Sequence, residues 1–381
     1  MRKIRVLVIG QTPPPFHGQA IMIEKLVHAR FDSIEIHHLR MSFSKSADEI
    51  GKFRWGKIIH LIRLLFHGTF LLLFRKIDAL YYPPAGPNFV PVMRDIMLLP
   101  LWRVFAPKII YHFRAGGVSE FLESKSRWLK ICARAAYGKP DGAIALSRFN
   151  PNDGEYFRAK QIFVIPNGLE DNFDPALVLR ERNQVRLFYA GLLNEEKGIQ
   201  TLLEAFHLIS ERHNNVSLHL AGEFRSEAEK ESFFKTADEY KIRDKIIFHG
   251  LLTGDAKWRL FAQTDIMCFL THYPSETFGN SVLEAMIWEL PVLGTRWRGV
   301  QDLIVDQETG FLVPIRDPAE AADRLELLVS DSELRVRMGK KGRQRFLQEF
   351  TLEKHLSRME SAILSTSTAQ EFLPPANAIE R

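Results

Sequence analysis

Two glutamates stand eight positions apart in the segment with the strongest signal for chemistry. Residues 275–286 read SETFGNSVLEAM, so Glu276 precedes a Phe-Gly pair and Glu284 follows it. Paired carboxylates can accept hydrogen bonds from the hydroxyl groups of a sugar. Residue types alone leave two interpretations open: a site for a sugar linked to phosphate, or a helix start whose acidic residues complement the helix dipole.

The same segment predicts the beginning of a helix. Asn280 and Ser281 are both good N-terminal cap residues. Gly279, directly before them, would let backbone amides approach a ligand closely. Because the first amides of a helix have no partner within it, this position favours an anion such as a phosphate.

Short apolar runs alternate with longer helical patterns along the whole chain. Most runs lack polar alternation, as in strands covered on both faces, and their alternation with helices indicates parallel sheets in doubly wound domains. Ligands of such sheets bind beyond the carboxyl ends of the strands. The expected strands are Ile4–Ile9, Ile34–Leu39, Ala79–Tyr82, Lys108–Phe113, Gly142–Leu146, Ile162–Ile165, Val185–Ala190, Val216–Ala221, Lys245–His249, Asp265–Leu270, Pro291–Gly294 and Phe311–Val313.

The length of 381 residues suits two domains. A Pro-Asn-Gly turn at 166–168, followed by a polar segment, marks the boundary. We expect a Rossmann-like domain over residues 1–170 and a second over 171–350. A helix over 351–366 is expected to cross back to the first domain, and a disordered tail over 367–381.

Composition excludes several classes of protein. Hydrophobic residues make up 46% and charged residues 25% of the chain, which is ordinary for a globular protein. Cys132 and Cys268 both lie in apolar stretches, so we expect two buried thiols, a reducing compartment and no zinc site. The first strand leads into Gln11 and three prolines, not into a Gly-x-Gly-x-x-Gly turn, which disfavours a dinucleotide dehydrogenase.

Charge is divided unevenly along the chain. Residues 1–170 carry 25 Lys and Arg against 13 Asp and Glu, whereas residues 171–381 carry 26 against 33. A basic half indicates an anionic partner. Since no motif of a nucleic-acid-binding module occurs, we expect no nucleic acid and favour an anionic membrane surface.

A basic amphipathic helix is predicted within residues 51–77, which contain no acidic residue. Lys57, His60, Arg63 and His67 recur there at helical spacing beside apolar residues, as in helices that lie in a membrane interface. A second stretch without acidic residues, between Asp95 and Glu120, adds aromatic and basic residues at 98–105. The alternative is a pair of ordinary helices that pack on the first sheet, with the basic face exposed to solvent. No run reaches the roughly 20 apolar residues that span a bilayer. We expect a cytoplasmic protein, peripheral at the inner face of the membrane, that leaves anionic vesicles at high salt.

Several short motifs occur together in one order. Besides SETFGNSVLEAM they are TPPPFHGQA at 12–20, IPNGL at 165–169, YAGLLNEEKGIQTLLEAF at 189–206, VSLHLAGE at 216–223, IIFHG at 246–250 and TGFLVP at 309–314. As an ordered set over residues 1–365, they resemble the retaining glycosyltransferases of family 4, glycosyl transferases group 1. The resemblance implies the GT-B fold, an α/β fold of two Rossmann-like, doubly wound domains facing across a cleft.

The resemblance implies a nucleotide-sugar site in the second domain. Glu276 would hold the hydroxyls of the donor sugar, Glu284 would hold those of the ribose, and Lys197 would neutralise the diphosphate. Backbone groups would contact the sugar, the diphosphate and the base. The implied donor-binding residues are Gly18, Gly191, Lys197, His249, Gly250, Leu251, Glu276, Thr277, Phe278, Gly279, Asn280 and Glu284.

The resemblance also assigns residues of the first domain. His112, at the end of an expected strand, would contact the donor sugar and join Glu276 and Lys197 as a catalytic residue. Without the resemblance, a lone histidine at a strand end is more often structural. Arg114 could meet an anionic acceptor, and Gly18 would bring the backbone near the phosphate or the acceptor.

The chain departs from the family at several positions. Leu192 stands where an arginine usually shares the charge of the diphosphate with the lysine, and Gln19 replaces a second glycine. Weaker donor binding, or a different way of stabilising the leaving diphosphate, is the expected consequence. Arg296 or Arg298, on the turn after an expected strand, could supply the missing cation.

The resemblance implies a hexosyltransferase that retains configuration. The acceptor hydroxyl would attack on the face from which the diphosphate leaves, and a phosphate oxygen would take its proton. This scheme requires no metal ion and no cofactor. The donor is expected to be linked to UDP or GDP, and the acceptor to be a lipid-linked saccharide used in cell-surface polysaccharide synthesis. The alternatives are a non-catalytic, nucleotide-binding member of a polysaccharide assembly complex, and an epimerase or phosphorylase of the same fold.

Overall fold

The computed structural model describes residues 2–14, 18–41, 55–84, 86–180 and 183–368, apart from the side chains of Trp55, Lys57 and Ile58. The chain forms two compact units. Unit 1 comprises Met1–Leu146, Pro151–Ile165 and His355–Arg381, and unit 2 comprises Ser147–Asn150 and Pro166–Lys354. Three expectations concern parts outside the described residues: the middle of the TPPPFHGQA motif, the side chain of Lys57, and the tail after residue 368.

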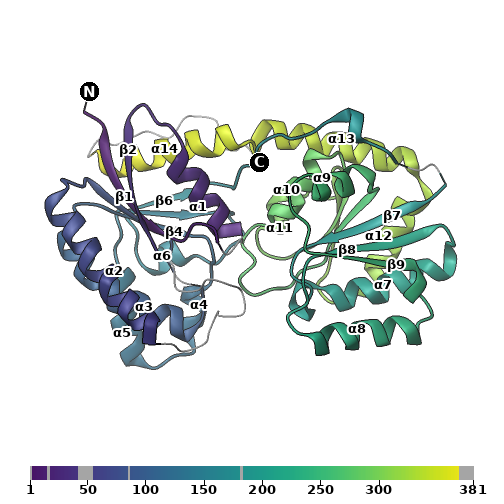
Figure 1. Ribbon diagram of the computed structural model, residues 1–381, viewed down its shortest axis with the longest axis horizontal. Helices are drawn as coiled ribbons and strands as arrows, with labels where there is room; N and C mark the ends of the chain where they lie inside the picture. Colours follow the sequence, from purple (N-terminus) through teal and green to yellow (C-terminus); the bar gives the residue numbers. More distant parts are fainter. Residues whose placement is uncertain (1, 15–17, 42–54, 85, 181–182, 369–381) are drawn as a thin grey trace. The chain divides into compact units, whose positions relative to one another are not determined.

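Unit 1 is built on a six-stranded parallel sheet with the strand order β2-β1-β3-β4-β5-β6 (Figure 1). Its central strands are apolar on both faces, and Val6 to Ile9 of β1 are all fully buried. Burial on both faces is typical of parallel strands whose crossover helices cover the sheet. The strands are β1 (Ile4–Gly10), β2 (Ile34–Arg40), β3 (Ala79–Tyr82), β4 (Ile109–Phe113), β5 (Gly142–Ala145) and β6 (Gln161–Val164).

Helices cover both faces of the first sheet. Trp102 of α3 and Tyr137 of α5 share a buried cluster with Leu80 on one face, whereas Ile23 of α1 and Ile363 of α14 belong to the cluster on the other. Figure 1 shows α2, α3 and α5 together on the first of these faces. The helices of unit 1 are α1 (Gly18–His28), α2 (Trp55–Phe74), α3 (Phe89–Phe105), α4 (Val118–Glu123), α5 (Arg127–Tyr137), α6 (Asp153–Tyr156) and α14 (Leu352–Ser367).

The last helix belongs with the first sheet over most of its length. Met359, Ala362 and Ile363 of α14 lie in a buried cluster with residues of β1 and β3. Ser365 Oγ also donates a hydrogen bond to Gln161 Oε1 at 3.1 Å. The chain from His355 onward is therefore part of unit 1, although it follows unit 2 in sequence.

Unit 2 contains a second six-stranded parallel sheet, with the order β12-β11-β10-β7-β8-β9. Numbered within the unit, this is the 3-2-1-4-5-6 order of nucleotide-binding Rossmann folds. The order reverses between the neighbours β7 and β10, and ligands of such sheets bind at this switch point. The strands are β7 (Val185–Ala190), β8 (Val216–Ala221), β9 (Ile246–Gly250), β10 (Ile266–Phe269), β11 (Val292–Thr295) and β12 (Gly310–Val313).

Helices cover the second sheet on both sides as well (Figure 1). Leu203 of α7, Phe233 of α8 and Leu325 of α12 share one buried cluster, and Phe261 of α9 packs its ring against Phe188 of β7 on the other side. The helices are η2 (Pro175–Leu177), η3 (Glu195–Lys197), α7 (Ile199–Arg212), α8 (Glu227–Glu239), η4 (Arg243–Lys245), α9 (Gly254–Gln263), α10 (Asn280–Ile287), α11 (Val300–Leu303), α12 (Pro318–Ser330) and α13 (Ser332–Glu349).

The twelve expected strands are all present, with ends that differ from expectation by at most one residue. The α/β class and the two doubly wound sheets are confirmed, whereas the cleft between them stays a prediction. The expectation of two buried thiols is wrong for Cys132, which is only half-buried beside the exposed Ile131 on α5, while Cys268 is buried in β10. Among the described helices, none combines the length and apolar character needed to cross a membrane.

Candidate functional site

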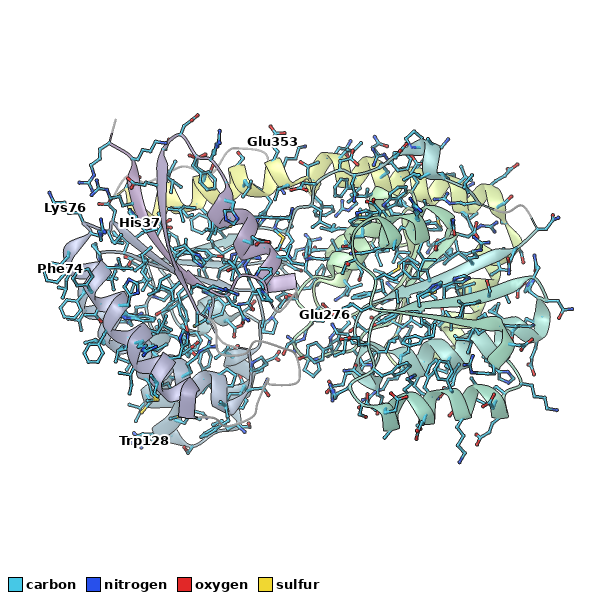
Figure 2. The ribbon with its side chains drawn as sticks, viewed as in Figure 1. His37, Phe74, Lys76, Trp128, Glu276 and Glu353 are labelled. Carbon is cyan, nitrogen blue, oxygen red and sulfur yellow. The ribbon has the colours of Figure 1, made fainter. Side chains whose placement is uncertain are left out.

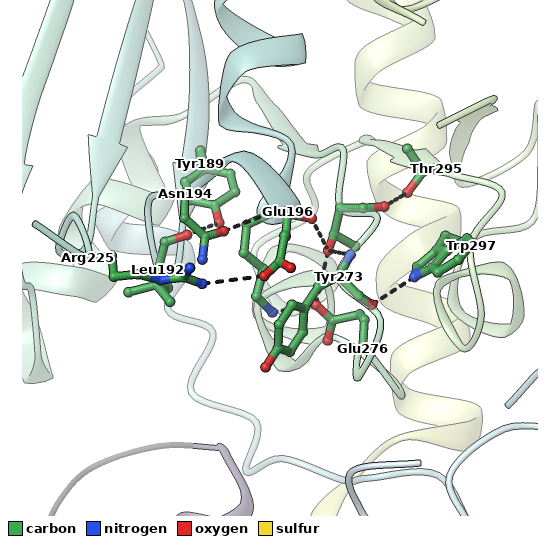
Figure 3. Close-up of polar contacts among 11 residues, drawn as sticks. Tyr189, Leu192, Asn194, Glu196, Arg225, Tyr273, Glu276, Thr295 and Trp297 are labelled. Carbon is green, nitrogen blue, oxygen red and sulfur yellow. Dashed lines mark hydrogen bonds and ion pairs between the residues drawn. The ribbon is translucent and has the colours of Figure 1, made fainter. Parts of the chain in front are cut away.

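The switch point of the second sheet brings two of the predicted residues together. Lys197 follows β7 and Glu276 follows β10. Lys197 Nζ lies 2.6 Å from Glu276 Oε2, and the two side chains are only 19% and 10% exposed. Figure 3 shows Glu276 among its polar neighbours. Partial withdrawal from water strengthens the interaction of such charges with each other and with any charged ligand.

A short turn fixes the position of the lysine. Asn194 Oδ1 accepts a hydrogen bond from Lys197 N at 2.9 Å, and η3 ends at Gly198. Gly198 has a φ of +79°, and a Cβ atom added there would lie 1.9 Å from the carbonyl oxygen of Leu270. Because the contact is with backbone, only glycine fits, and the turn after β7 is held against the end of β10.

Side chains that the sequence did not single out surround the ion pair. Lys197 Nζ lies 4.7 Å from the ring centroid of Tyr273, within the range of a cation–π interaction. Thr271 Oγ1 donates a hydrogen bond to Glu276 Oε2 at 3.4 Å, and Trp297 Nε1 donates one to the carbonyl of Tyr273 at 2.9 Å (Figure 3). Their position directly after β10 and β11 is the one signal that could have indicated them.

The segment after Glu276 presents backbone at the start of α10. Thr277 and Phe278 are buried, and Gly279 has a φ of +104°, a left-handed conformation that favours glycine. The prediction of a side-chain cap is wrong for Asn280, because Gly279 is the cap residue and Asn280 Oδ1 instead accepts a hydrogen bond from Asn167 Nδ2 at 2.9 Å. The amides at this helix start are not capped by a side chain, which suits an anion.

The second glutamate of the motif has a different partner. Glu284 Oε1, within α10, lies 2.5 Å from Lys257 Nζ of α9, a lysine that the sequence did not single out. Burial raises the pKa of the Glu284 carboxyl, and the charge of Lys257 opposes that shift. Glu276 and Glu284 are therefore each paired with a lysine from a distant part of the chain.

Removing Lys257 should make stability depend on pH. A carboxyl whose pKa is raised in the folded state stabilises the protein most below its unfolded pKa, and stability falls as pH rises through the folded pKa. In Lys257→Met the pKa of Glu284 would rise further, so we expect a loss of about 3 kcal/mol near pH 8 and a clearly smaller loss near pH 5. Chemical denaturation measures both. Lys257→Met/Glu284→Gln should recover most of the loss, and an equal loss at both pH values would contradict the account.

Three strands of the second sheet end in glycine. Gly191 follows β7, Gly222 follows β8, and Gly250 closes β9. Gly222 N donates a hydrogen bond to Gly250 O at 2.8 Å, and a Cβ on Gly222 would lie 1.8 Å from Gly191 O. Gly222 is buried against Gly191, whereas Gly191 is exposed and presents backbone without a side chain, which permits close approach of a ligand there.

The side chain of His249, one of the residues expected near the nucleotide base, contacts another histidine. His249 Nε2 lies 3.0 Å from His219 Nδ1, and the two rings are stacked. Burial lowers the pKa of both histidines, that of His219 to about 4, so the pair is neutral at pH 7. Leu251 is 65% exposed. Any contact of residues 249–251 with a base would therefore come from the backbone or from Leu251.

In unit 1, His112 is held by its neighbours. It is fully buried in β4, and its Nδ1 lies 2.7 Å from the hydroxyl of Tyr81, to which Arg114 Nε donates at 3.4 Å. With the ring proton of His112 on Nε2, the hydroxyl can accept from the arginine and donate to Nδ1. Burial, with the nearby charges of Arg114 and His355, puts the pKa of His112 well below its ordinary value, so the ring is neutral.

The remaining predicted residues of unit 1 differ in exposure. Arg114 is buried, whereas Gly18 is exposed at the start of α1. His112 Nε2 has no hydrogen-bond partner among the described residues. A buried ring N–H without a partner costs free energy, and a bound ligand would satisfy it.

From the sequence, Arg296 and Arg298 are the candidates to replace the cation that is missing at Leu192. Leu192 is 43% exposed. Arg296 Nη2 is paired with Asp306 at 2.8 Å, which argues against it as the substitute. Arg298 has a φ of +42° and precedes Gly299, whose added Cβ would lie 1.9 Å from Thr277 O, so this turn lies against the loop after Glu276.

A further arginine stands near the same position. A bridge between Leu193 and Phe224 aligns the turn after β7 with the turn after β8. Arg225, the next residue, reaches Glu196 Oε2 at 3.4 Å (Figure 3). The sequence did not single out Arg225, because its proximity depends on the pairing of two loops.

Two solved structures share the whole fold. A sucrose-phosphate synthase from Thermosynechococcus elongatus superposes with a TM-score of 0.71 at 17% identity and covers 95% of this chain and 98% of its own. HepE from Anabaena, in complex with UDP and glucose, gives a TM-score of 0.70 at 16% identity and covers 95% and 100%. At these identities the likeness establishes the fold alone, which is GT-B.

The sequence comparisons give a family match for the second unit. Residues 172–345, the greater part of unit 2, match the family described as Glycosyl transferases group 1. The capsular polysaccharide biosynthesis glycosyltransferase CapM of Staphylococcus aureus is 27% identical over 224 residues, which are 58% of this chain and 55% of CapM. The match thus spans about half the length of this curated relative.

Proposed function

We propose that the protein is a retaining glycosyltransferase that moves a hexose from a UDP- or GDP-linked donor to a saccharide acceptor. The observation that carries the proposal is the Lys197–Glu276 ion pair. It lies at the switch point of a Rossmann-like sheet, in a segment that matches the Glycosyl transferases group 1 family. A cation and a carboxylate side by side match a ligand that joins a diphosphate to a polyhydroxylated sugar.

In the proposed complex the two members of the pair divide the donor between them. Lys197 turns to the diphosphate, and Glu276 accepts hydrogen bonds from the sugar hydroxyls. The backbone of Thr277, Phe278, Gly279 and Asn280 contacts the sugar and the diphosphate, and Glu284 holds the ribose. The glycine ends of β7 and β9 admit the phosphate and the base.

The proposed reaction depends on where charge develops and which groups stabilise it. The acceptor hydroxyl attacks the anomeric carbon on the face that the diphosphate leaves, and a phosphate oxygen takes the proton of the hydroxyl. Negative charge grows on the leaving diphosphate, where Lys197 and the start of α10 stabilise it. Because these groups supply the compensating charge, the scheme requires neither a metal ion nor a cofactor.

Unit 1 supplies the remaining contacts in this proposal. The Nε2–H of neutral His112 donates to the donor sugar, Arg114 meets an anionic acceptor, and Gly18 brings backbone near the phosphate. In His112→Ala, transfer should slow about 100-fold because a positioned donor is lost. Nucleotide affinity should stay unchanged, because the nucleotide is held by unit 2. Transfer rates and calorimetry measure the two effects.

A second substitution separates chemistry from packing at His112. Tyr81→Phe keeps the imidazole but removes the hydroxyl that fixes its tautomer, so a smaller loss of about tenfold is expected. A transfer rate in His112→Ala equal to that of the wild type would contradict the role. So would equal losses in the two variants.

The acceptor is proposed to be a lipid-linked saccharide used for a cell-surface polysaccharide. The name of CapM places that relative in capsular polysaccharide biosynthesis, and the basic first half of this chain suits an anionic surface. We infer a cytoplasmic protein that associates peripherally with the inner face of the membrane. Transfer to soluble saccharides but never to lipid-linked ones would count against this acceptor.

A panel of UDP- and GDP-sugars tests the reaction. Purified protein is incubated with each donor and nucleotide release is followed, with Glu276→Ala as the control. Release from one donor that is lost in the variant supports a donor-specific transferase. If no donor reacts, with or without a lipid-linked acceptor, while nucleotide still binds, the non-catalytic alternative replaces the proposal.

A further inference from the structure

The outward sides of three helices of unit 1 carry a concentration of exposed apolar side chains. α3 packs against both α2 and α5 on one face of the first sheet. More than half of the large apolar side chains exposed among the described residues lie on these helices. We call this surface the three-helix face, defined by Phe66, Phe70 and Phe74 of α2, Met97 and Val104 of α3, and Trp128 of α5.

α2 is apolar on two opposite sides. Leu64 and Leu72 face the interior of the unit and are almost fully buried. On the other side Ile62, Phe66 and Phe70 recur at intervals of four residues and are 48%, 70% and 53% exposed. A helix that covers a sheet in water normally presents polar residues on that outer side. The outer side of α2 therefore lacks the partner that its composition requires.

The same arrangement extends over the neighbouring helices. Met97 and Val104 of α3, one heptad apart, are 58% and 74% exposed, and Trp128 and Ile131 of α5 are 68% and 55% exposed. Figure 2 labels Phe74 and Trp128, which both project from the periphery of unit 1, away from its sheet. The exposed apolar surface therefore spans three adjacent helices and not one amphipathic helix alone.

The exposed charged residues of the three helices themselves are all basic. Arg63 and His67 of α2 and Arg127 and Arg134 of α5 are exposed beside the apolar residues. The sole acidic residue of the three helices, as far as they are described, is Asp95. It is fully buried, and two tyrosine hydroxyls donate hydrogen bonds to it. A partner of this surface must therefore be apolar at its centre and anionic around it.

We propose that the three-helix face inserts into an anionic lipid bilayer, with its apolar side chains among the acyl chains and its arginines at the headgroups. A bilayer interface offers this combination of apolar interior and anionic surface. The inference deepens the proposed membrane association by naming the surface, and it rests on the proposed function only for the presence of a lipid-linked acceptor. The sequence alone predicted release from anionic vesicles at high salt. Insertion of the three-helix face predicts instead that high salt weakens binding without abolishing it, because acyl-chain contacts are not screened.

Vesicle sedimentation of the full chain tests the surface. Vesicles of phosphatidylcholine with phosphatidylglycerol should bind the wild type, and vesicles of phosphatidylcholine alone should bind it more weakly. Phe66→Ser/Val104→Ser should reduce binding at least about tenfold, because two exposed apolar side chains that would insert among the acyl chains are lost. The control is Leu327→Ser/Val336→Ser, which removes two exposed apolar side chains from unit 2 and should bind like the wild type.

Fluorescence quenching tests separately whether the three-helix face penetrates the bilayer. Lipids brominated in the acyl chain should quench tryptophan fluorescence of the bound wild type, and the quenching should fall in Trp128→Phe. No binding to either vesicle, or equal losses in the two serine pairs, would overturn the proposal. So would self-association without lipid that Phe66→Ser/Val104→Ser abolishes, because a second copy of the chain would then cover the face. None of these outcomes depends on sugar transfer, which the donor panel tests separately.

Discussion

Replacing Lys197 with methionine is expected to slow nucleotide release from the donor by about 1,000-fold. Lys197 is the cation that lies at the switch point with Glu276, and methionine keeps the length of the side chain without its charge. The charge that grows on the diphosphate in the transition state would lose its nearest compensating group. Initial rates at saturating donor measure the effect, and calorimetry should show weaker nucleotide binding.

Two further substitutions make the result specific. Lys235→Met removes an exposed lysine from α8 and should leave the rate unchanged. Glu276→Gln should also abolish transfer, yet it frees Lys197 from its carboxylate, so nucleotide diphosphate should bind at least as tightly as in the wild type. If Lys197→Met turns over normally, or if Glu276→Gln loses nucleotide binding as Lys197→Met does, the division of roles within the pair is wrong.

The second large effect concerns the free energy of unfolding. Gly198→Ala is expected to destabilise the protein by more than about 4 kcal/mol, or to prevent folding. The added Cβ would lie 1.9 Å from the carbonyl oxygen of Leu270, and neither backbone can move without displacing the turn that carries Lys197. Denaturant unfolding, or the yield of folded protein, measures the loss.

Gly254 is the matched control for this steric argument. Its φ of +57° also lies in the left-handed region, but a Cβ added there meets no atom within 4 Å. Gly254→Ala should therefore cost only the backbone strain, about 1 kcal/mol. Similar losses in the two variants would show that conformation, and not the contact with Leu270, requires glycine at position 198.

The sequence was sufficient for the strands and for placing Lys197 and Glu276 at the same edge of the second sheet. Strands buried on both faces appear as uninterrupted apolar runs, and a parallel sheet places the turns after Ala190 and Phe269 at one edge. Lys197 and Glu276 were therefore predictable as neighbours once their strands were adjacent. Which strands are adjacent follows from the order of the sheet, and that order is a property of Rossmann folds in general.

Other features of the site could not be read from the sequence. Lys257 pairs with Glu284 because α9 and α10 cover the same side of the sheet, a contact between segments 27 positions apart that no motif marks. His249 stacks on His219 because β8 and β9 are neighbours in register. These contacts depend on side-chain direction, which spacing along the chain does not specify.

The three-helix face was visible in the sequence only in part. The basic residues Arg63 and His67 suggested an interfacial helix, but apolar residues on both sides of α2 gave no indication of which side packs on the sheet. Trp128, 62 positions after Phe66 in the chain, joins the same surface because α5 packs against α3. The structure thus adds α5 to the two segments that the sequence indicated, now α2 and α3, and makes one surface of three helices.

Calorimetric titration with UDP and with GDP tests the central claim most directly, because it needs no knowledge of the sugar or of the acceptor. The account predicts that one of the two nucleotides binds with a stoichiometry of about one per chain and that Lys197→Met weakens this binding at least about tenfold. Binding of neither nucleotide to folded protein would contradict a nucleotide-sugar site at the switch point of the second sheet.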